Sequence, residues 1–254
     1  YWRIKFQKNN LQEKDYAVQL HDLLEESIDL RMVSDVPVGV LLSGGLDSSI
    51  VATVATKKSK NELNTYTVGF EDKIDSAYDE LEESKEMAEI LGTNHHEIVV
   101  NSNDAFKLLD KVTLCLDEPF GNPTTTLNYI ISEFASKTSK VVLSGVGGDE
   151  MFGGYPKYRA LQIYQEYKKF PKSLVKKFGG IFQKIPDSMS ESIVKGKIFF
   201  DAWKENPEDQ YYSLITYFKE KEKEKLLNSS ISLPSRRFID ELFLESKKSN
   251  AESF

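Results

Sequence analysis

The sequence Val38-Gly39-Val40-Leu41-Leu42-Ser43-Gly44-Gly45-Leu46-Asp47-Ser48-Ser49 decides the fold of this chain. Its apolar first part predicts a buried strand, the paired glycines predict a turn, and the residues from Ser48 onward are compatible with a helix. Gly44 and Gly45 allow backbone amides to approach an anion, and the following helix directs its positive end to the same place. We call residues 43–49 the first glycine segment, and this segment predicts a phosphate cradle.

The polar side chains of the first glycine segment fit the same chemistry. Ser43, Ser48 and Ser49 supply hydroxyl donors. Asp47 would repel a phosphate group directly, so its presence predicts a divalent cation between the carboxylate and the phosphate oxygens. The segment is not a Walker A loop, because no Gly-x-x-x-x-Gly-Lys-Ser/Thr string occurs in the chain. A plain glycine turn between strand and helix is the alternative.

Strand and helix patterns alternate over the first part of the chain. Further apolar runs predict strands at residues 66–70, 97–100 and 140–144, and apolar spacing predicts helices at 14–33, 77–91, 104–116 and 125–138. This alternation predicts an α/β fold, in which helices cover both faces of a parallel sheet. The later part of the sequence is rich in aromatic residues and lysine, and its pattern predicts helices. We therefore expect a core at residues 1–160 and a helical extension of the same domain at residues 161–254.

A second glycine-rich stretch follows the strand predicted at residues 140–144. It reads Ser144-Gly145-Val146-Gly147-Gly148-Asp149-Glu150-Met151-Phe152-Gly153-Gly154-Tyr155, and we call it the second glycine segment. Because both segments follow strands of one parallel sheet, Asp47 and Asp149 are predicted to bind one Mg²⁺ together with phosphate oxygens. Glycines 145, 147 and 148 are expected to let the backbone lie flat against a nucleotide. A tight turn with Asp149 as a helix N-cap is the alternative.

The first segment resembles the pyrophosphate loop (PP-loop) of the ATP pyrophosphatases. The two segments together resemble the synthetase domain of the glutamine-hydrolysing asparagine synthetases. The resemblance to this synthetase domain extends to residues 31–40, 91–97 and 117–123. The resemblance implies an ATP pyrophosphatase-like fold, which is also that of the adenine nucleotide alpha hydrolases.

The resemblance also implies a reaction and its site. In this family ATP adenylates the side-chain carboxylate of aspartate, giving β-aspartyl-AMP and pyrophosphate, and ammonia then displaces AMP to give asparagine. The ammonia comes from glutamine, which is hydrolysed in an N-terminal domain expected to precede this chain. The family pattern implies pyrophosphate contacts for Ser43, Gly44, Gly45, Asp47 and Ser48, Mg²⁺ ligation by Asp47 and Asp149, and adenosine contacts for Leu41, Val68, Ser144 and Gly145. It places the amino-acid substrate near residues 124–126.

The chain departs from the family pattern at Val146, where relatives carry Glu or Asp. Three explanations stay open, besides an engineered substitution. Glu150 takes over the role of that acid and joins Asp47 and Asp149 as a catalytic residue. Alternatively, the acceptor differs, as in relatives that close β-lactam rings or amidate sugar carboxylates. In the third explanation, the chain is a catalytically weakened nucleotide-binding module. The downstream Lys-x-Asp-Arg string of the family is also absent from the sequence, so we expect the chain to stop short of it.

Composition limits the remaining functions. The 254 residues carry a net charge of −7, which argues against a general nucleic-acid binder, and 40% are hydrophobic, as in globular proteins. No run approaches the ~20 apolar residues of a membrane span. The first residues lack the pattern of a signal peptide, and the lone Cys115 excludes an internal disulfide. These features favour the cytoplasm. The missing initiator Met predicts a piece of a longer protein, and a homodimer is compatible with the sequence.

Two other residue groups invite a functional interpretation that we do not adopt. His95, His96 and Glu97 suggest a metal site, but neighbouring strand residues point to opposite faces of a sheet. Cys115 lies between two leucines in a predicted helix, so we expect a small buried hydrophobic residue there.

Overall fold

The computed structural model describes residues 10–71, 80–117, 122, 124–166, 174, 177, 179–181, 184–186, 191–203, 207–216, 223, 225–226 and 240–241. The chain divides into two compact units. The first unit comprises Asn9–Gly148, and the described residues of the second unit begin at Asp149. The sequence-based boundary between residues 160 and 161 concerns a change of pattern within the second unit and stays a prediction.

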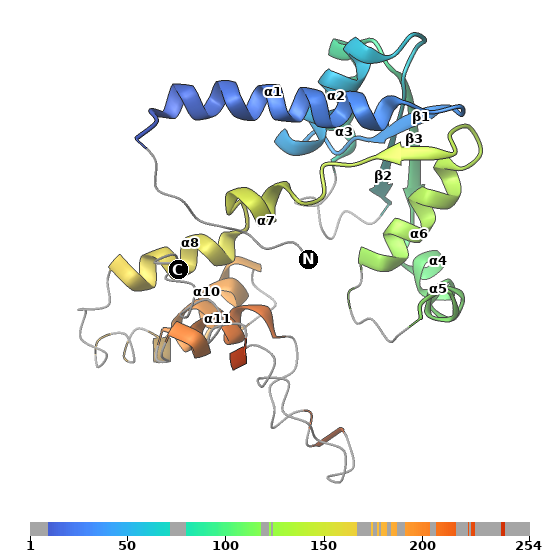
Figure 1. Cartoon of the computed structure of the whole chain (residues 1–254). Helices are drawn as coiled ribbons and strands as arrows, with labels where there is room; N and C mark the ends of the chain where they lie inside the picture. Colours follow the sequence, from blue (N-terminus) through green and yellow to red (C-terminus); the bar gives the residue numbers. More distant parts are fainter. Residues whose placement is uncertain are drawn as a thin grey trace. The chain divides into compact units, whose positions relative to one another are not determined.

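Four parallel strands form the sheet of the first unit (Figure 1). They are β1 (Val38–Leu41), β2 (Asn64–Phe70), β3 (Asn94–Val100) and β4 (Val141–Leu143), in the order β3-β2-β1-β4. Leu41 pairs with Tyr66 of β2, and Val40 pairs with Leu143 of β4. The predicted parallel sheet is therefore confirmed. The order of the strands reverses between β1 and β4, so their carboxyl ends flank a topological switch point, where open α/β sheets bind ligands.

Helices cover both faces of this sheet. On one face, α2 (Leu46–Lys58) and α3 (Leu81–Leu91) pack on the strands, and α1 (Glu13–Met32) packs on α2. The core on this face includes Val40, Leu42, Ala52 and Ala88. On the other face, Ile131 and Ala135 of α6 (Thr124–Ala135) pack with Tyr66, Leu41 and Val142. Successive residues of β1 thus enter opposite cores, as the period of two in a strand requires. The predicted α/β layering is confirmed.

Several element boundaries differ from those predicted. The helix expected at 104–116 is two helices, α4 (Ser102–Lys107) and α5 (Leu109–Cys115), which meet at Leu108. Strand β3 begins at Asn94 rather than at Glu97, because pairing with β2 extends through the polar residues Asn94, His95 and His96. Gly92 ends α3 with a left-handed φ of 66°, as predicted for a C-cap. Residues 77–79, 118–121 and 123 of the predicted features lie outside the described residues.

The described part of the second unit is helical, as predicted. It contains α7 (Gly148–Phe152), which starts at the last residue of the first unit, and α8 (Pro156–Glu166), α10 (Glu191–Ala202) and α11 (Pro207–Ile215). Tyr164 of α8 stacks on Phe199 of α10 with ring centroids 4.8 Å apart, and its hydroxyl donates to the Phe199 carbonyl at 2.7 Å. Trp203 contacts the same Tyr164 ring edge-on. Aromatic packing therefore joins α8 to α10.

The prediction that Cys115 is buried is wrong. This residue is exposed rather than buried, because α5 turns Val112 into the core and leaves Leu114, the preceding residue, 86% exposed. A separate search for membrane spans gives a negative result: within the described ranges, no helix is both long enough and apolar enough to cross a bilayer.

Candidate functional site

The first glycine segment forms the turn between β1 and α2. Gly44 adopts a left-handed φ of 72°, which favours glycine, and Gly45 is the N-cap of α2. No side chain within the described ranges caps the start of this helix. Its first-turn amides therefore keep hydrogen-bonding capacity for an anion, at the positive end of the helix dipole.

Two serines stabilise this turn from within. The Ser48 hydroxyl is buried, accepts from the Ser43 amide at 3.1 Å and donates to the Gly45 carbonyl at 3.2 Å. The Ser43 hydroxyl lies 2.8 Å from it and accepts from the Gly45 amide at 3.3 Å. These bonds hold the shape of the cradle, so both serines have a structural role whether or not they also contact phosphate.

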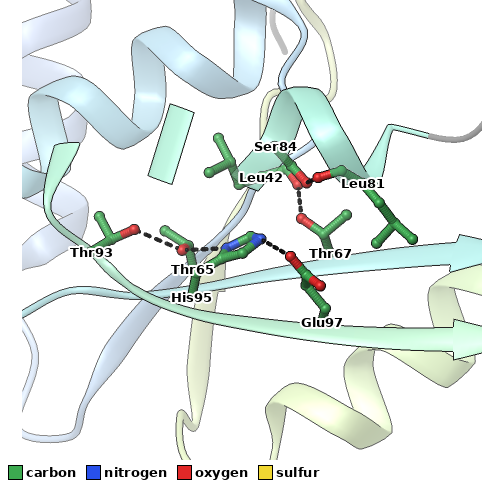
Figure 2. A network of polar contacts seen from close by, with 8 residues as sticks. All are labelled: Leu42, Thr65, Thr67, Leu81, Ser84, Thr93, His95 and Glu97. Carbon is green, nitrogen blue, oxygen red and sulfur yellow. Dashed lines mark hydrogen bonds and ion pairs between the residues drawn. The ribbon is translucent and has the colours of Figure 1, made fainter. Parts of the chain in front are cut away.

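Neighbouring elements support the start of the segment (Figure 2). Thr67 of β2 donates its buried hydroxyl to the Leu42 carbonyl, directly before the segment. A Cβ placed on Gly44 would lie 2.6 Å from the Cβ of Glu83 and 2.8 Å from the Ser84 amide, so α3 packs directly on this glycine. Sequence reasoning missed Thr67 and Glu83; a threonine inside an apolar strand was the one available signal.

The first part of the second glycine segment packs against the first segment. A Cβ on Gly145 would lie 2.6 Å from the Ser48 amide, and one on Gly148 would overlap the Asp47 carboxylate. Gly147 has a φ of 106°, and a Cβ there would meet no described residue within 4 Å. The expected flat backbone against a nucleotide stays a prediction. The structure adds another reason for these glycines, because two of them make room for Asp47 and the start of α2.

Asp47 is suited to hold a hard cation. It lies half-buried in the first turn of α2, and within the described ranges its carboxylate makes no hydrogen bond or ion pair. No group of three His, Cys, Asp or Glu side chains converges on a metal site anywhere in the described part of the chain. Mg²⁺ needs no such group, because it keeps several waters and binds one or two carboxylates together with substrate phosphates. The residues present therefore fit Mg²⁺.

Three of the expected adenosine contacts, Leu41, Ser144 and Gly145, lie at the switch point, whereas Val68 lies on β2 at the other side of β1. Leu41 ends β1 and Ser144 follows β4 directly, with Gly145 next to it. Leu41 and Val68 are partly buried and pack against the core that faces α6. Near the expected amino-acid site, Thr126 is buried in α6, whereas the Thr124 hydroxyl donates to the Asn122 side chain at 2.8 Å.

The two acids of the second glycine segment belong to the second unit. Gly154 donates its amide to the Asp149 carbonyl at 3.1 Å, and a Cβ on Gly154 would overlap the Asp149 carboxylate. The Tyr155 hydroxyl donates to Glu150 at 2.7 Å. This bond, with smaller effects of burial and nearby charges, raises the pKa of Tyr155 to about 12. Because Asp47 and Asp149 lie in different units, their shared Mg²⁺ site stays a prediction.

A separate cavity of about 450 Å³ lies beside the start of β3. His95 lines it and accepts or donates at Nδ1 to the Thr65 hydroxyl at 2.9 Å (Figure 2). His96 points to the opposite face, where it stacks on Tyr66. Burial lowers the pKa of His95, although Glu97 lies 3.5 Å from its Nε2. The two imidazoles therefore face apart, as predicted, and this cavity contains none of the expected site residues.

The family model and the curated relatives that match this chain indicate the same family. The family model described as asparagine synthase matches residues 19–250. Glutamine-hydrolyzing asparagine synthetase 1 of Bacillus subtilis (strain 168) is 31% identical over 227 residues, which are 89% of this chain and 34% of that protein. Putative glutamine-hydrolyzing asparagine synthetase 2 of Methanocaldococcus jannaschii is 39% identical over 175 residues, covering 68% of this chain and 33% of that protein. The chain thus spans about a third of the length of these curated relatives.

A solved structure also aligns with the chain, although loosely. It is an NH3-dependent NAD synthetase from Campylobacter jejuni, with 16% identity and a TM-score of 0.36 over 96% of this chain and 98% of that chain.

Proposed function

This chain belongs to the asparagine synthase family, and we propose that the protein containing it is an AMP-forming amide ligase. In the proposed reaction, a carboxylate oxygen of aspartate attacks the α-phosphorus of ATP and pyrophosphate leaves. Ammonia then attacks the acyl carbon of β-aspartyl-AMP, AMP leaves, and asparagine is formed. The ammonia comes from glutamine hydrolysed in an N-terminal domain, as the names of the relatives suggest for those proteins.

One observation carries the proposal. The two glycine segments leave the adjacent parallel strands β1 and β4 at the switch point of the sheet, and Gly145 and Gly148 pack on Asp47 and Ser48. Among the residues that the structure describes, a helix N-terminus without a side-chain cap thus lies together with a carboxylate that has no hydrogen-bond or ion-pair partner. That combination suits a nucleotide phosphate accompanied by a cation.

The proposed roles follow from this arrangement. Ser43, Gly44, Gly45 and Ser48 contact the pyrophosphate. The turn keeps its shape through bonds from the Ser43 amide to the Ser48 hydroxyl and from the Gly45 amide to the Ser43 hydroxyl. Leu41, Val68, Ser144 and Gly145 contact the adenosine. Asp47 and Asp149 would hold Mg²⁺, which supplies neutralisation of charge on the leaving pyrophosphate. Catalysis then depends mainly on alignment of the aspartate oxygen with the α-phosphorus.

Proton removal during attack by ammonia is the one step that needs a base. Val146 cannot supply it, so we assign this role to Glu150, the next carboxylate after Asp149.

A second candidate function keeps the chemistry and changes the acceptor. Val146 is 89% exposed and places an apolar group at the tip of the second glycine segment. An acceptor carboxylate with an apolar neighbouring group would use that surface; β-lactam closure and amidation of a sugar carboxylate are the changed acceptors considered above. A weakened nucleotide-binding module is the non-catalytic alternative.

The test uses full-length protein with ATP, Mg²⁺, aspartate and ammonium. We expect AMP and pyrophosphate in equal amounts. Asp47→Ala should abolish Mg-ATP binding, whereas Asp22→Asn on the exposed surface of α1 should leave both binding and turnover unchanged.

Three other results would redirect the proposal. Pyrophosphate release with another carboxylate but not with aspartate would favour the changed acceptor. Tight Mg-ATP binding without any turnover would favour the nucleotide-binding module. No binding and no turnover in the wild type would reject the proposed function.

A further inference from the structure

The cavity beside the start of β3 lies apart from both glycine segments. Its volume of about 450 Å³ is typical of a small-molecule site. Gly92, Thr93 and His95 line it at the amino end of β3, whereas the glycine segments follow the carboxyl ends of β1 and β4. In a parallel sheet these ends lie at opposite edges. All of the lining residues belong to the first unit, so one unit forms the whole cavity.

His95 presents a buried polar atom to this cavity. Its side chain is 10% exposed, and its Nε2 is buried without a hydrogen-bond partner among the described residues. Nε2 faces Glu97, which also lines the cavity (Figure 2). The carboxylate oxygen lies 3.5 Å away, which is longer than an ordinary N–H···O hydrogen bond. Because buried polar atoms are normally paired, this one points to a missing partner.

A chain of hydroxyl groups assigns the proton on the His95 ring. The fully buried Thr65 Oγ1 lies 2.9 Å from both Thr93 Oγ1 and His95 Nδ1. A lone pair on Nε2 would face the Glu97 carboxylate and be repelled by it, so the proton belongs on Nε2. Nδ1 then accepts from Thr65, which accepts from Thr93. Burial lowers the pKa of His95, so the ring is neutral at pH 7. Nε2 is therefore a neutral donor that requires an acceptor.

The charged side chains of the lining are exposed and mostly unpaired. Lys85 and Glu89 lie one turn apart on α3, and Glu62 lies directly before the core residue at position 63. Within the part of the chain that the structure describes, these three side chains make no hydrogen bond or ion pair. Together with Glu97, they give the lining three carboxylates and one ammonium group. The described residues form no set of three metal ligands, so the carboxylates suit an organic cation better than a metal ion.

We propose that this cavity binds a free α-amino acid with a cationic side chain, such as L-lysine. The ligand carboxylate accepts from Lys85 and from the Nε2 of His95, and the two ligand ammonium groups donate to Glu62 and Glu89. A simple diamine would leave both protein donors without an acceptor, so the carboxylate is part of the recognition. The site contains none of the residues assigned to the amide ligase reaction, and the inference does not depend on the proposed function.

Calorimetric titration of full-length protein with L-lysine, without nucleotide, tests the site. Low ionic strength is used because salt screens exposed charges. We expect saturable binding of one L-lysine per chain. Three analogues each lack one charged group: cadaverine lacks the carboxylate, L-norleucine the side-chain ammonium, and 6-aminohexanoate the α-ammonium. Each should bind at least about tenfold more weakly, the loss expected for one charge-assisted hydrogen bond.

Variants locate the ligand in the cavity. Lys85→Met and Glu89→Gln should each weaken L-lysine binding by at least about tenfold. Glu86→Gln is the matched control, since this exposed residue lies on α3 but does not line the cavity, and it should keep the wild-type affinity. Unchanged affinity in both cavity variants would overturn the inference.

Two results with the wild type would also overturn the inference: no saturable binding of L-lysine, or equal affinity for L-lysine and L-norleucine. The outcome is separate from that of the ligase assay, because the titration contains no nucleotide. A protein that binds L-lysine in this way but releases no pyrophosphate with any acceptor would support the cavity site and reject only the proposed function.

Discussion

A Cβ added to Gly148 would overlap the carboxylate of Asp47, although the two residues come from separate glycine segments. Any side chain at position 148 would occupy the space of that carboxylate. The contact therefore determines where the proposed metal ligand lies relative to the end of β4. It also provides the first test of the site.

Gly148→Ala should displace Asp47. We expect weaker Mg-ATP binding and a free energy of unfolding lower by about 1–3 kcal/mol, the usual cost of an added group in a packed space. Calorimetric titration and thermal unfolding measure the two effects. Gly180→Ala is the control, because a Cβ there meets no described residue within 4 Å. Equal Mg-ATP affinity in both variants would show that Asp47 is not restrained by this contact.

Gly44→Ala tests the packing of the first segment on α3. Gly44 and Gly92 have similar left-handed φ values, 72° and 66°, but only Gly44 has close neighbours, with Glu83 at 2.6 Å from an added Cβ. Gly92→Ala should cost about 1 kcal/mol for the backbone conformation alone. Gly44→Ala should cost clearly more. The difference between their unfolding free energies measures the contact, and no difference would argue against it.

Thr67→Val removes the hydroxyl that serves the Leu42 carbonyl before the first segment. Loss of a buried hydrogen bond partner costs about 1–3 kcal/mol, so we expect a lower unfolding free energy. Thr56→Val is the matched control: its hydroxyl donates to the Ala52 carbonyl at 2.7 Å, inside a helix where the main chain also supplies a donor. Denaturant unfolding of both variants checks the prediction, which fails if the two are equally stable.

His95 should make stability depend on pH. Burial lowers its pKa below the ordinary 6.5, while Glu97 opposes the shift and His96 and Lys85 add to it. The unfolded chain therefore binds more protons than the folded chain near and below pH 6.5, and stability falls as the pH falls through that range. Melting temperatures from pH 8 to pH 5 should show a smaller decline in His95→Gln. His21→Gln, an exposed histidine on α1, should keep the wild-type decline. A wild-type slope in His95→Gln would contradict the assignment.

Local sequence patterns were sufficient to predict most of the strands of the sheet and most of its helices. The apolar runs in β1 and β4 predicted strands because a sheet covered on both faces requires continuous apolar residues. The glycine at position 92 predicted the end of α3 for a conformational reason that needs no partner. The start of β3 was missed because Asn94, His95 and His96 are polar, and only pairing with β2 makes them part of a strand. Cys115 was wrongly predicted to be buried, because the sequence around it does not show which side of α5 faces the core.

The residues of the candidate site likewise include some that local sequence predicts and some that it does not. Both glycine segments, and the residues expected in them, were found from residue types and order. Thr67 and Glu83 were not, because each acts on the first segment from another element. Tyr155 was visible in the sequence, but its bond to Glu150 depends on the reversal at Gly153.

The sequence by itself determined the family, the alternation of strands and helices, and the two glycine turns with their acids, because these depend on local residue order. The tertiary structure alone decided that β1 and β4 are neighbours and that Gly145 and Gly148 pack on Asp47 and Ser48. The physical reason is that strand order and close packing arise from contacts between residues far apart in the chain. Those contacts bring the two glycine turns to one edge of the sheet.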